Sequence, residues 1–312
     1  MPPKKPSSIA DAQHPSYRHF KVTDNELETL IARFCNDLTA RAKEGKGDPI
    51  TGRENEVDEI LTILLHRGRS NVVLLGGAGT GKTAVFVATA QRIAANRDVP
   101  KLLKDARVLE LDFALVGAGT ESRGEFEGRL VPLLKGVGER NETKEYPQIV
   151  LCIDELHTIM RTCHASSASG VADLLKPYLT VGNLQVIGAT TEVEYDEHVR
   201  RDPAMDRRFQ KIVLKQPNAE ETVNILKNIR KGYEKHFDII IPDEICEQIV
   251  KLASKYIRNR NNPDKSIMVM DGACARFCKD GAPNARLGGT LTLEYIKKSV
   301  GAEINVAPEV IE

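Results

Sequence analysis

A glycine-rich segment directly after a short apolar run constrains this chain more than any other feature. The run Val72–Leu75 is typical of a buried strand, and residues 76–83 follow it in the pattern GxxxxGKT. Glycines let the backbone N–H groups of such a turn close around a polyphosphate, and the N-terminus of a following helix favours negative charge. The predicted phosphate-binding residues are Gly76, Gly77, Ala78, Gly79, Thr80, Gly81, Lys82 and Thr83. The pattern thus predicts a phosphate loop between a strand and a helix; the alternative is an ordinary glycine-rich turn.

Two side chains at the end of this segment have specific expected roles. Lys82 would reach the terminal phosphates, and Thr83 would offer its hydroxyl to Mg²⁺. A dinucleotide fingerprint is excluded by spacing, because neither Gly76 nor Gly77 begins GxGxxG and because Lys82-Thr83 would have no role in one. We therefore expect a nucleotide polyphosphate with Mg²⁺ as the ligand.

A second apolar run ends in two acids. Residues 148–153 are typical of a strand, and Asp154 and Glu155 follow. Carboxylates at the end of a buried strand cost free energy unless something binds them. We expect Asp154 in the Mg²⁺ shell and Glu155 as the general base that holds the attacking water in line. The alternative is that both acids only cap the N-terminus of a helix.

Two threonines follow a third apolar run, and two arginines precede a fourth. Residues 184–189 end at Thr190-Thr191, where a hydroxyl could sense the γ-phosphate; the alternative is a helix cap. Arg207 and Arg208 precede the strand of residues 212–214, and their alternative is plain solvation. The order of phosphate loop, acidic strand end, polar strand end and arginine pair resembles that of an AAA+ module. Such modules supply an arginine finger to the nucleotide of the neighbouring subunit.

Several longer motifs resemble the first ATPase module of the Clp disaggregases and unfoldases (ClpA, ClpB and ClpC). From about Asp48 to about Cys278 they occur in the family's order: Asp48–Arg53, Arg123–Glu127, Ile153–Thr158, Leu175–Pro177, Gly188–Thr191, Arg207–Gln210 and Pro263–Ile267. The resemblance implies ATP as the nucleotide and assembly into hexameric rings. It also implies that Ile50 and Thr51 lie near adenine, that Thr191 is the first sensor, and that Arg207 and Arg208 act in trans.

The composition limits which classes of partner and which compartment we expect. Among 312 residues, 44 Lys and Arg balance 44 Asp and Glu, so nothing in the net charge indicates nucleic acid or an anionic membrane as the main partner. The six cysteines lack metal-binding spacing, which favours a reduced compartment. No apolar run reaches transmembrane length. We expect a cytoplasmic location, with organellar targeting by the N-terminal arm left open.

The predicted fold class is α/β. Five strand candidates near residues 72, 108, 149, 185 and 211 alternate with helices, as expected of a P-loop NTPase parallel sheet with helices on both faces, and a small all-α lid follows. The expected divisions are a disordered arm (1–22), an N-terminal helix and linker (23–47), the large ATPase domain (48–216), the helical lid (217–303) and a tail (304–312). The helical stripe over residues 25–43 favours a brace against the core over a partner-binding helix. Lys265 of the lid either approaches the nucleotide or is solvated.

The expected pore loop departs from the Clp pattern. That family has an aromatic residue directly before Arg-Gly-Glu-Phe to grip polypeptide, whereas this chain has residues 117–122 (GAGTES), without an aromatic and with one extra residue. The second pore segment, residues 162–170, is small and polar. The N-terminal substrate domain and second ATPase module of Clp unfoldases are also not recognisable in these residues.

These observations predict a Mg²⁺-ATP-dependent ATPase that forms a homo-oligomeric ring and remodels a protein partner. One alternative is a non-threading ATPase switch whose nucleotide state controls assembly or docking to a protein scaffold. Another class, a DNA-remodelling or loading ATPase, is disfavoured by the neutral charge and by the lack of a recognisable DNA-binding appendix.

Overall fold

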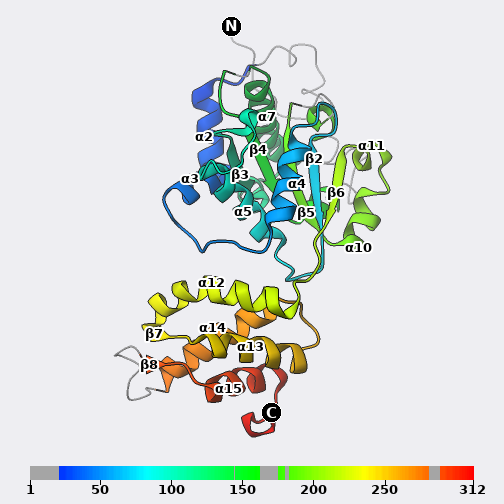
Figure 1. The fold of residues 1–312 in the computed structure, drawn as a ribbon. Helices are drawn as coiled ribbons and strands as arrows, with labels where there is room; N and C mark the ends of the chain where they lie inside the picture. Colours follow the sequence, from blue (N-terminus) through cyan, green and yellow to red (C-terminus); the bar gives the residue numbers. More distant parts are fainter. Residues whose placement is uncertain (1–20, 144, 162–174, 180–182, 281–288) are drawn as a thin grey trace. The chain divides into compact units, whose positions relative to one another are not determined.

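The computed structural model describes residues 21–143, 145–161, 175–179, 183–280 and 289–312. The chain forms two compact units (Figure 1). Within the described residues, the first unit holds residues 21–46, 57–75 and 89–212, and the second holds 47–56, 76–88 and 213–312. The phosphate loop therefore groups with the lid residues, although the sequence predicts both 47–56 and 76–88 within or beside the large ATPase domain.

A six-stranded sheet in the order β1-β3-β4-β5-β2-β6 forms the centre of the first unit. Its strands are β1 (Cys35–Asp37), β2 (Asn71–Leu75), β3 (Arg107–Leu111), β4 (Ile149–Ile153), β5 (Gln185–Thr190) and β6 (Phe209–Val213). The pairs β3–β4, β4–β5 and β5–β2 are parallel. Every residue of β2, β4 and β5 is buried, as their continuous apolar runs predict for strands covered on both faces.

The register of the sheet fixes where the polar strand ends lie. Leu75 of β2 pairs with Thr190 of β5, and Ile153 of β4 pairs with Gly188 of β5. Because these strands are parallel, all three end at the same edge of the sheet. In open parallel sheets, ligands bind at this carboxyl edge.

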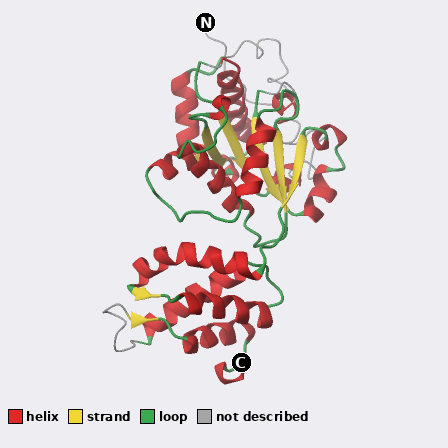
Figure 2. Ribbon diagram, in the orientation of Figure 1, coloured by secondary structure: helices red, strands yellow, loops and turns green. Residues whose placement is uncertain are grey.

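Helices lie on both faces of this sheet (Figure 2). Beyond the N-terminal segment they are α4 (Glu54–Leu64), α5 (Lys82–Ala94), α6 (Phe113–Gly117), α7 (Arg123–Thr143), α8 (Leu156–Arg161), α10 (Glu192–Glu194) and α11 (Pro203–Asp206). A short 3₁₀ helix, η2 (Lys101–Leu103), and a π-helix, η3 (Tyr195–Val199), complete the set. This mostly parallel sheet with helices on both faces is the α/β architecture that the sequence predicts.

The predicted helix over residues 25–43 is wrong in its middle. Helix α2 (Asp24–Phe34) ends at Phe34, strand β1 adds an antiparallel edge against β3, and helix α3 (Leu38–Lys43) then begins. Asp37 explains the new start, because its carboxylate accepts from the backbone N–H of Ala40 at 2.8 Å as an N-cap. The apolar periodicity of the sequence continues across residues 35–37, so it does not reveal this break.

Helix α2 packs against the core of the first unit. Leu27, Ile31 and Phe34 are buried in it, and the helix lies against α7. The Arg107 guanidinium of β3 binds Glu28 of α2 at 2.9 Å and Asp37 of β1 at 3.0 Å. These contacts are those expected of a brace.

The second unit contains a helical lid with its own core. Its helices are α12 (Ala219–Phe237), α13 (Asp243–Tyr256), α14 (Asp264–Lys279) and α15 (Leu293–Ile304). Asn218 begins α12 with a reciprocal capping box to Glu221. The lid also holds one short parallel strand pair, β7 (Ile239–Ile240) with β8 (Gly289–Thr290), which the sequence does not predict. In the predicted tail, η4 (Pro308–Val310) leads to Ile311, which is fully buried in the lid core.

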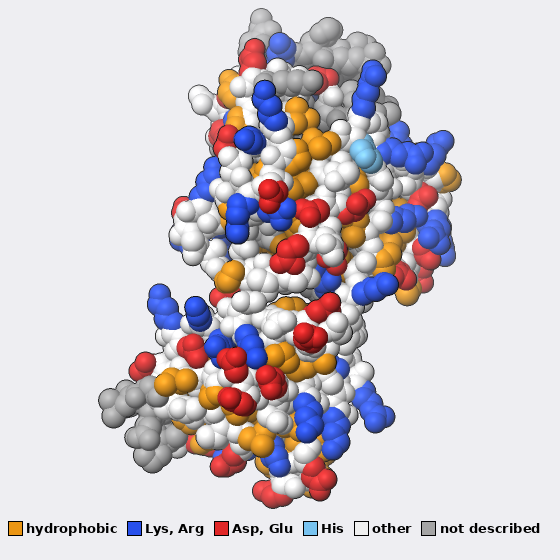
Figure 3. All heavy atoms as spheres, in the orientation of Figure 1, with side chains coloured by type: hydrophobic (Ala, Val, Ile, Leu, Met, Phe, Trp, Pro, Cys, Tyr) orange, Lys and Arg blue, Asp and Glu red, His pale blue; other side chains and the backbone are white. Residues whose placement is uncertain are grey.

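The surface carries mixed charge. Positive and negative side chains alternate over the face in Figure 3, consistent with the balanced composition. Among the described residues, no helix combines the length and apolar character that a membrane span needs.

Candidate nucleotide-binding site

The backbone of the phosphate loop requires its glycines. Gly79 and Gly81 have φ of +76° and +91°, in the left-handed region that disfavours side chains. A Cβ on Gly79 would lie 2.7 Å from Cβ of Asp264, and one on Gly76 would lie 3.0 Å from the carbonyl oxygen of Leu214. The sequence pattern is therefore met by a loop that admits no side chain at these positions.

Lys82 and Thr83 begin helix α5 directly after the loop. Lys82 is buried, and its ammonium donates to the carbonyl oxygens of Gly76 at 2.9 Å and Gly77 at 3.1 Å. The Thr80 hydroxyl also donates to Gly77, at 2.9 Å. Thr83 is exposed on the first turn of the helix. The loop thus has one cation held at its centre.

Arg53 holds the loop from outside, a role that the sequence does not reveal. Its side chain is 9% exposed, and it donates to the carbonyl oxygens of Thr80 at 2.7 Å and Lys215 at 3.1 Å. Glu56 accepts from the same guanidinium at 2.8 Å and balances its charge. The planar fork of arginine suits such a multiple contact. In the sequence, Arg53 was marked by its place at the end of the Asp48–Arg53 motif.

The residues predicted near adenine lie in the same unit as this loop. Ile50 and Thr51 are half-buried, and the hydroxyl of Thr51 accepts from the amide of Asn228 in α12 at 3.0 Å. Asn261 donates to the carbonyl oxygen of Ala78 at 3.0 Å. The two asparagines are lid contacts that the sequence does not single out, since neither belongs to a motif with a known ligand role.

Lys265 is neither solvated nor available to a phosphate in this structure. Its side chain is buried, and Nζ donates to the carbonyl oxygen of Ile257 at 3.0 Å. Burial lowers the pKa of this ammonium. The solvated alternative is therefore wrong, because the lysine is a structural contact between α14 and the end of α13.

The two acids follow β4 in a fixed backbone geometry. Glu155 has φ of +49°, and its N–H donates to the Asp154 carboxylate at 2.9 Å. The N–H and hydroxyl of Thr158 both donate to the Glu155 carbonyl oxygen at 2.8 Å. A left-handed non-glycine residue costs about 1–3 kcal/mol, and such residues are enriched at functional sites. The Glu155 side chain is 55% exposed.

Thr190 and Thr191 end β5 beside these acids. Thr191 caps α10, since its hydroxyl accepts from the N–H of Glu194 at 3.2 Å and donates to the Glu194 carboxylate at 2.8 Å. The capping alternative therefore describes Thr191 in this structure, and its sensor role stays a prediction. Thr190 is fully buried and donates to Glu194 at 3.1 Å.

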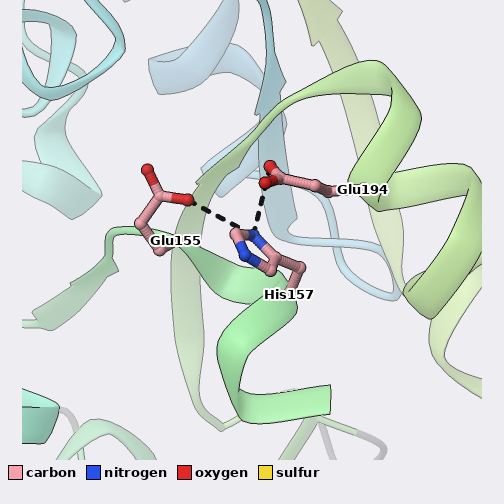
Figure 4. Close-up of side chains that lie close together, drawn as sticks. All are labelled: Glu155, His157 and Glu194. Atoms are coloured by element: carbon pink, nitrogen blue, oxygen red, sulfur yellow. Dashed lines mark ion pairs between the residues drawn. The ribbon is translucent and has the colours of Figure 1, made fainter. Parts of the chain in front are cut away.

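His157, which the sequence does not single out, lies between the two glutamates (Figure 4). Its Nδ1 is 3.3 Å from Glu155 Oε2, 3.2 Å from Glu194 Oε2 and 3.0 Å from the Thr190 hydroxyl. Partial burial opposes ionisation of Glu194, but hydrogen bonds from Thr191 outweigh it and hold the pKa of Glu194 below its usual value. For Glu194, the sequence offered one indication, which is the spacing Thr191-x-x-Glu194 of a capping box.

Glu155, His157 and Glu194 also have ligand atoms close enough for a metal, all within 4.8 Å of one another. Hydrogen bonds account for this grouping without an ion. The Glu194 Oε2 atom already accepts from Thr190, from the Thr191 hydroxyl and from the Thr191 N–H. We therefore interpret His157, Glu194 and the two threonines as a hydrogen-bonded group, with Glu155 at ion-pair distance from His157.

The arginine pair follows α11. Asp202 caps this helix and binds Lys176 at 2.6 Å, and Asp206 at its end binds Lys211 at 2.8 Å and the Tyr195 hydroxyl at 2.9 Å. Arg207 is exposed, and its Nε donates to the carbonyl oxygen of Pro203 at 3.0 Å. The less exposed Arg208 donates to the carbonyl oxygen of Ala204.

Two family matches cover this architecture. Residues 72–216 match the ATPase family associated with various cellular activities (AAA), and residues 218–286 match the AAA lid domain. The first of these matches is to a family of ATPases.

Relatives of similar sequence are Clp proteins. The chain is 43% identical over 246 residues to an ATP-dependent Clp protease ATP-binding subunit ClpA homolog of Guillardia theta, covering 79% of this chain and 29% of the relative. It is 41% identical over 251 residues to the chaperone protein ClpB of Aquifex aeolicus, covering 80% of this chain and 24% of the relative. The chain thus spans less than a third of the length of these relatives.

Solved structures of similar fold include Hsp104. A closed-state reconstruction of Hsp104 with ATPγS and FITC casein superposes with a TM-score of 0.80 at 34% identity, covering 91% of this chain and 47% of that chain. The S. cerevisiae Hsp104–ADP complex gives a TM-score of 0.77 at 35% identity, covering 88% and 45%.

The Arg53 contacts generate a test of loop order. Arg53→Ala leaves the carbonyl oxygens of Thr80 and Lys215 without this donor, so the loop is less ordered before ATP binds. Part of the binding free energy must then be used to order it. A loss of about 1.4 kcal/mol lowers affinity roughly tenfold. We expect this loss for ATP in a fluorescent-nucleotide titration. Arg92→Ala, which removes an exposed ion pair with Asp58 at 2.6 Å, is the matched control and should bind as wild type. Equal affinities for all three proteins would contradict the assigned role.

Proposed function

We propose that this chain, an AAA ATPase domain followed by an AAA lid domain, binds Mg²⁺-ATP on residues 76–83 and hydrolyses it with Glu155 as the general base. The observation that carries the proposal is the register of the sheet: the strands that precede the loop, the acids and the threonines end together. Nucleotide chemistry of this kind needs phosphates, base and polar sensor in one place.

The donor set fits magnesium. The Thr83 hydroxyl and the Asp154 carboxylate are hard oxygen ligands, which Mg²⁺ prefers. These two residues would hold the ion, which when bound neutralises charge on the phosphates. Lys82 would add a second cation, Ile50 and Thr51 would contact adenine, and Thr191 would act as sensor.

Binding and hydrolysis should separate in two variants. Lys82→Ala removes the loop's cation and should weaken ATP binding, whereas Glu155→Gln keeps shape and binding but cannot take a proton. Loss of a general base typically costs about 10²–10⁴-fold in rate. We expect Glu155→Gln to retain bound ATP in filter binding while phosphate release falls in that range. Exposed Glu145→Gln is the control. Phosphate release by Glu155→Gln at the wild-type rate would refute the assignment of the base.

The arginine pair supports assembly into a homo-oligomeric ring, by resemblance a hexamer. Arg207 is exposed at the end of a helix that Asp202, Asp206 and Tyr195 anchor. An arginine that completes the site of a neighbouring copy needs this combination of exposure and firm support. We propose that Arg207 and Arg208 act in trans on the nucleotide of the adjacent subunit.

Mixing two inactive variants tests this arrangement. Arg207→Ala should bind ATP nearly as wild type but hydrolyse it slowly, since an arginine finger is worth roughly 10³–10⁵ in rate. Adding Lys82→Ala chains should restore part of the activity, because they supply Arg207 to the intact loop of a neighbour. The double variant Lys82→Ala/Arg207→Ala, mixed in the same way, is the control and should restore nothing. Equal rates for both mixtures would exclude the trans role.

We propose that the module acts on a protein partner or complex, as the Clp resemblance implies. A specific observation favours the switch alternative, in which nucleotide state controls assembly or docking without threading. Ser122, at the position of the family's gripping aromatic, accepts from the N–H of Glu125 at 3.3 Å, and Glu125 accepts from the N–H of Glu121 at 3.0 Å. The position thus forms a helix cap with little contact area. The second pore segment, residues 162–170, lies outside the described residues. A cytoplasmic location also stays a prediction.

An unfolding assay decides between threading and switching. We expect wild-type protein to hydrolyse ATP without unfolding a stable tagged fluorescent protein, because a serine gives little surface to grip a backbone. Ser122→Tyr adds the aromatic ring and is the informative partner, while Ser122→Ala controls for loss of the cap. Unfolding by wild-type protein with steady loss of fluorescence would restore the threading interpretation.

A further inference from the structure

We propose that Asn261 of the lid is a positioning residue for nucleotide binding: its side-chain amide fixes the peptide between Ala78 and Gly79 so that the Gly79 N–H is presented to a phosphate oxygen. The inference rests on the proposed function, since it assumes that residues 76–83 bind the phosphates of ATP. It makes the order of the phosphate loop depend on a lid side chain that belongs to no phosphate-binding motif.

The Asn261 side chain lies directly on the phosphate loop, within the same unit of the fold. Its Nδ2 donates to the carbonyl oxygen of Ala78 at 3.0 Å. The same Nδ2 would lie 2.8 Å from a Cβ placed on Gly77, so this position admits no side chain while Asn261 stays in place. Asp264 packs equally closely on Gly79, at 2.7 Å from the corresponding Cβ position. Two lid residues therefore contact the loop at its glycines.

The carbonyl group that Asn261 holds sets the direction of the next N–H. The peptide between Ala78 and Gly79 is trans, and in a planar trans peptide the C=O and the N–H point in opposite directions. Because the Ala78 carbonyl points at Asn261, the Gly79 N–H points away from this lid side chain. Asn261 thus fixes a donor that it does not itself touch.

Arg53 acts on the loop in the same way two residues later. Its guanidinium holds the carbonyl oxygen of Thr80 at 2.7 Å, which directs the Gly81 N–H away from Arg53. Among the residues that the structure describes, neither Gly79 nor Gly81 donates its N–H to a protein acceptor. Oriented backbone N–H groups of this kind bind anions, so a phosphate oxygen is the acceptor that we infer for both.

The turn between α13 and α14 fixes Asn261 in its place. The backbone carbonyl of Asn261 accepts from the Lys265 N–H at 3.1 Å. The next residue, buried Asn262, donates to the Ser254 hydroxyl of α13 at 3.3 Å and accepts from the Ser266 hydroxyl of α14 at 2.7 Å. Contacts to both helices hold the turn, so Asn261 does not have to be ordered when ATP binds. Its contribution should therefore appear as affinity for the polyphosphate.

Equilibrium binding of a polyphosphate tests this role. Asn261→Ala removes the donor, and we expect it to raise the Kd of both fluorescent ATP and competing tripolyphosphate about fivefold, as loss of one hydrogen bond predicts. Adenosine, which has no phosphate, should compete as it does with wild-type protein. A lid residue with only a structural role would weaken the binding of adenosine and tripolyphosphate alike.

A second variant separates the hydrogen bond from the shape of the side chain. Asn261→Asp keeps the shape but sets a carboxylate oxygen against the carbonyl oxygen of Ala78. It should bind ATP about tenfold more weakly than Asn259→Asp, which places the same charge on an exposed residue of the same turn. This pair keeps the test valid if thermal unfolding shows that Asn261→Ala does not fold.

Lys82→Ala in the same series distinguishes failure of this inference from failure of the proposed function. If wild-type protein does not bind tripolyphosphate, or if Lys82→Ala binds it as tightly as wild type, the phosphate loop itself is refuted. Three results overturn the inference on Asn261 while the proposed function stands: Asn261→Ala matches wild type, Asn261→Asp matches Asn259→Asp, or Asn261→Ala weakens adenosine as much as tripolyphosphate.

Discussion

The parallel pairing of β2, β4 and β5 is the constraint on which the rest of the site depends. Their hydrogen-bonded register sets Leu75 against Thr190 and Ile153 against Gly188. Residues 76–83, the two acids and the threonines each follow one of these strands. The acids and the threonines therefore lie at one edge of the sheet of the first unit, at positions set by buried backbone.

Two networks of polar side chains, one in each unit, hold the residues that follow these strands. In the second unit, Arg53 and Lys82 satisfy the carbonyl oxygens of the phosphate loop from opposite ends. In the first, the Thr190 hydroxyl bonds His157 and Glu194, and Thr191 bonds Glu194, while Glu155 lies at ion-pair distance from His157. Both networks are built from groups whose loss leaves a buried polar atom unpaired, which makes each of them selective about substitution.

Much of this could be predicted from sequence, because the strong signals are local. The loop pattern, the apolar strands and the acids at a strand end each lie within a dozen residues. Arg53 and His157 could not be assigned roles, since their partners lie up to 162 and 37 residues away, at Lys215 and Glu194. The break at Cys35 was missed because β1 forms by pairing with β3. Neither alternative weighed for Lys265 describes its contact to Ile257, because burial of a lysine depends on the packing of α14 against α13, which periodicity does not fix.

The central claim is that this edge hydrolyses ATP and that a neighbouring copy completes the site. It is tested most directly by phosphate release from wild-type protein in Mg²⁺-ATP across a wide range of protein concentration. The account predicts Mg²⁺-dependent release whose specific rate rises steeply as copies associate, then levels off. A specific rate that is constant from dilute to concentrated protein would contradict completion by a neighbour, and no release at any concentration would contradict the site itself.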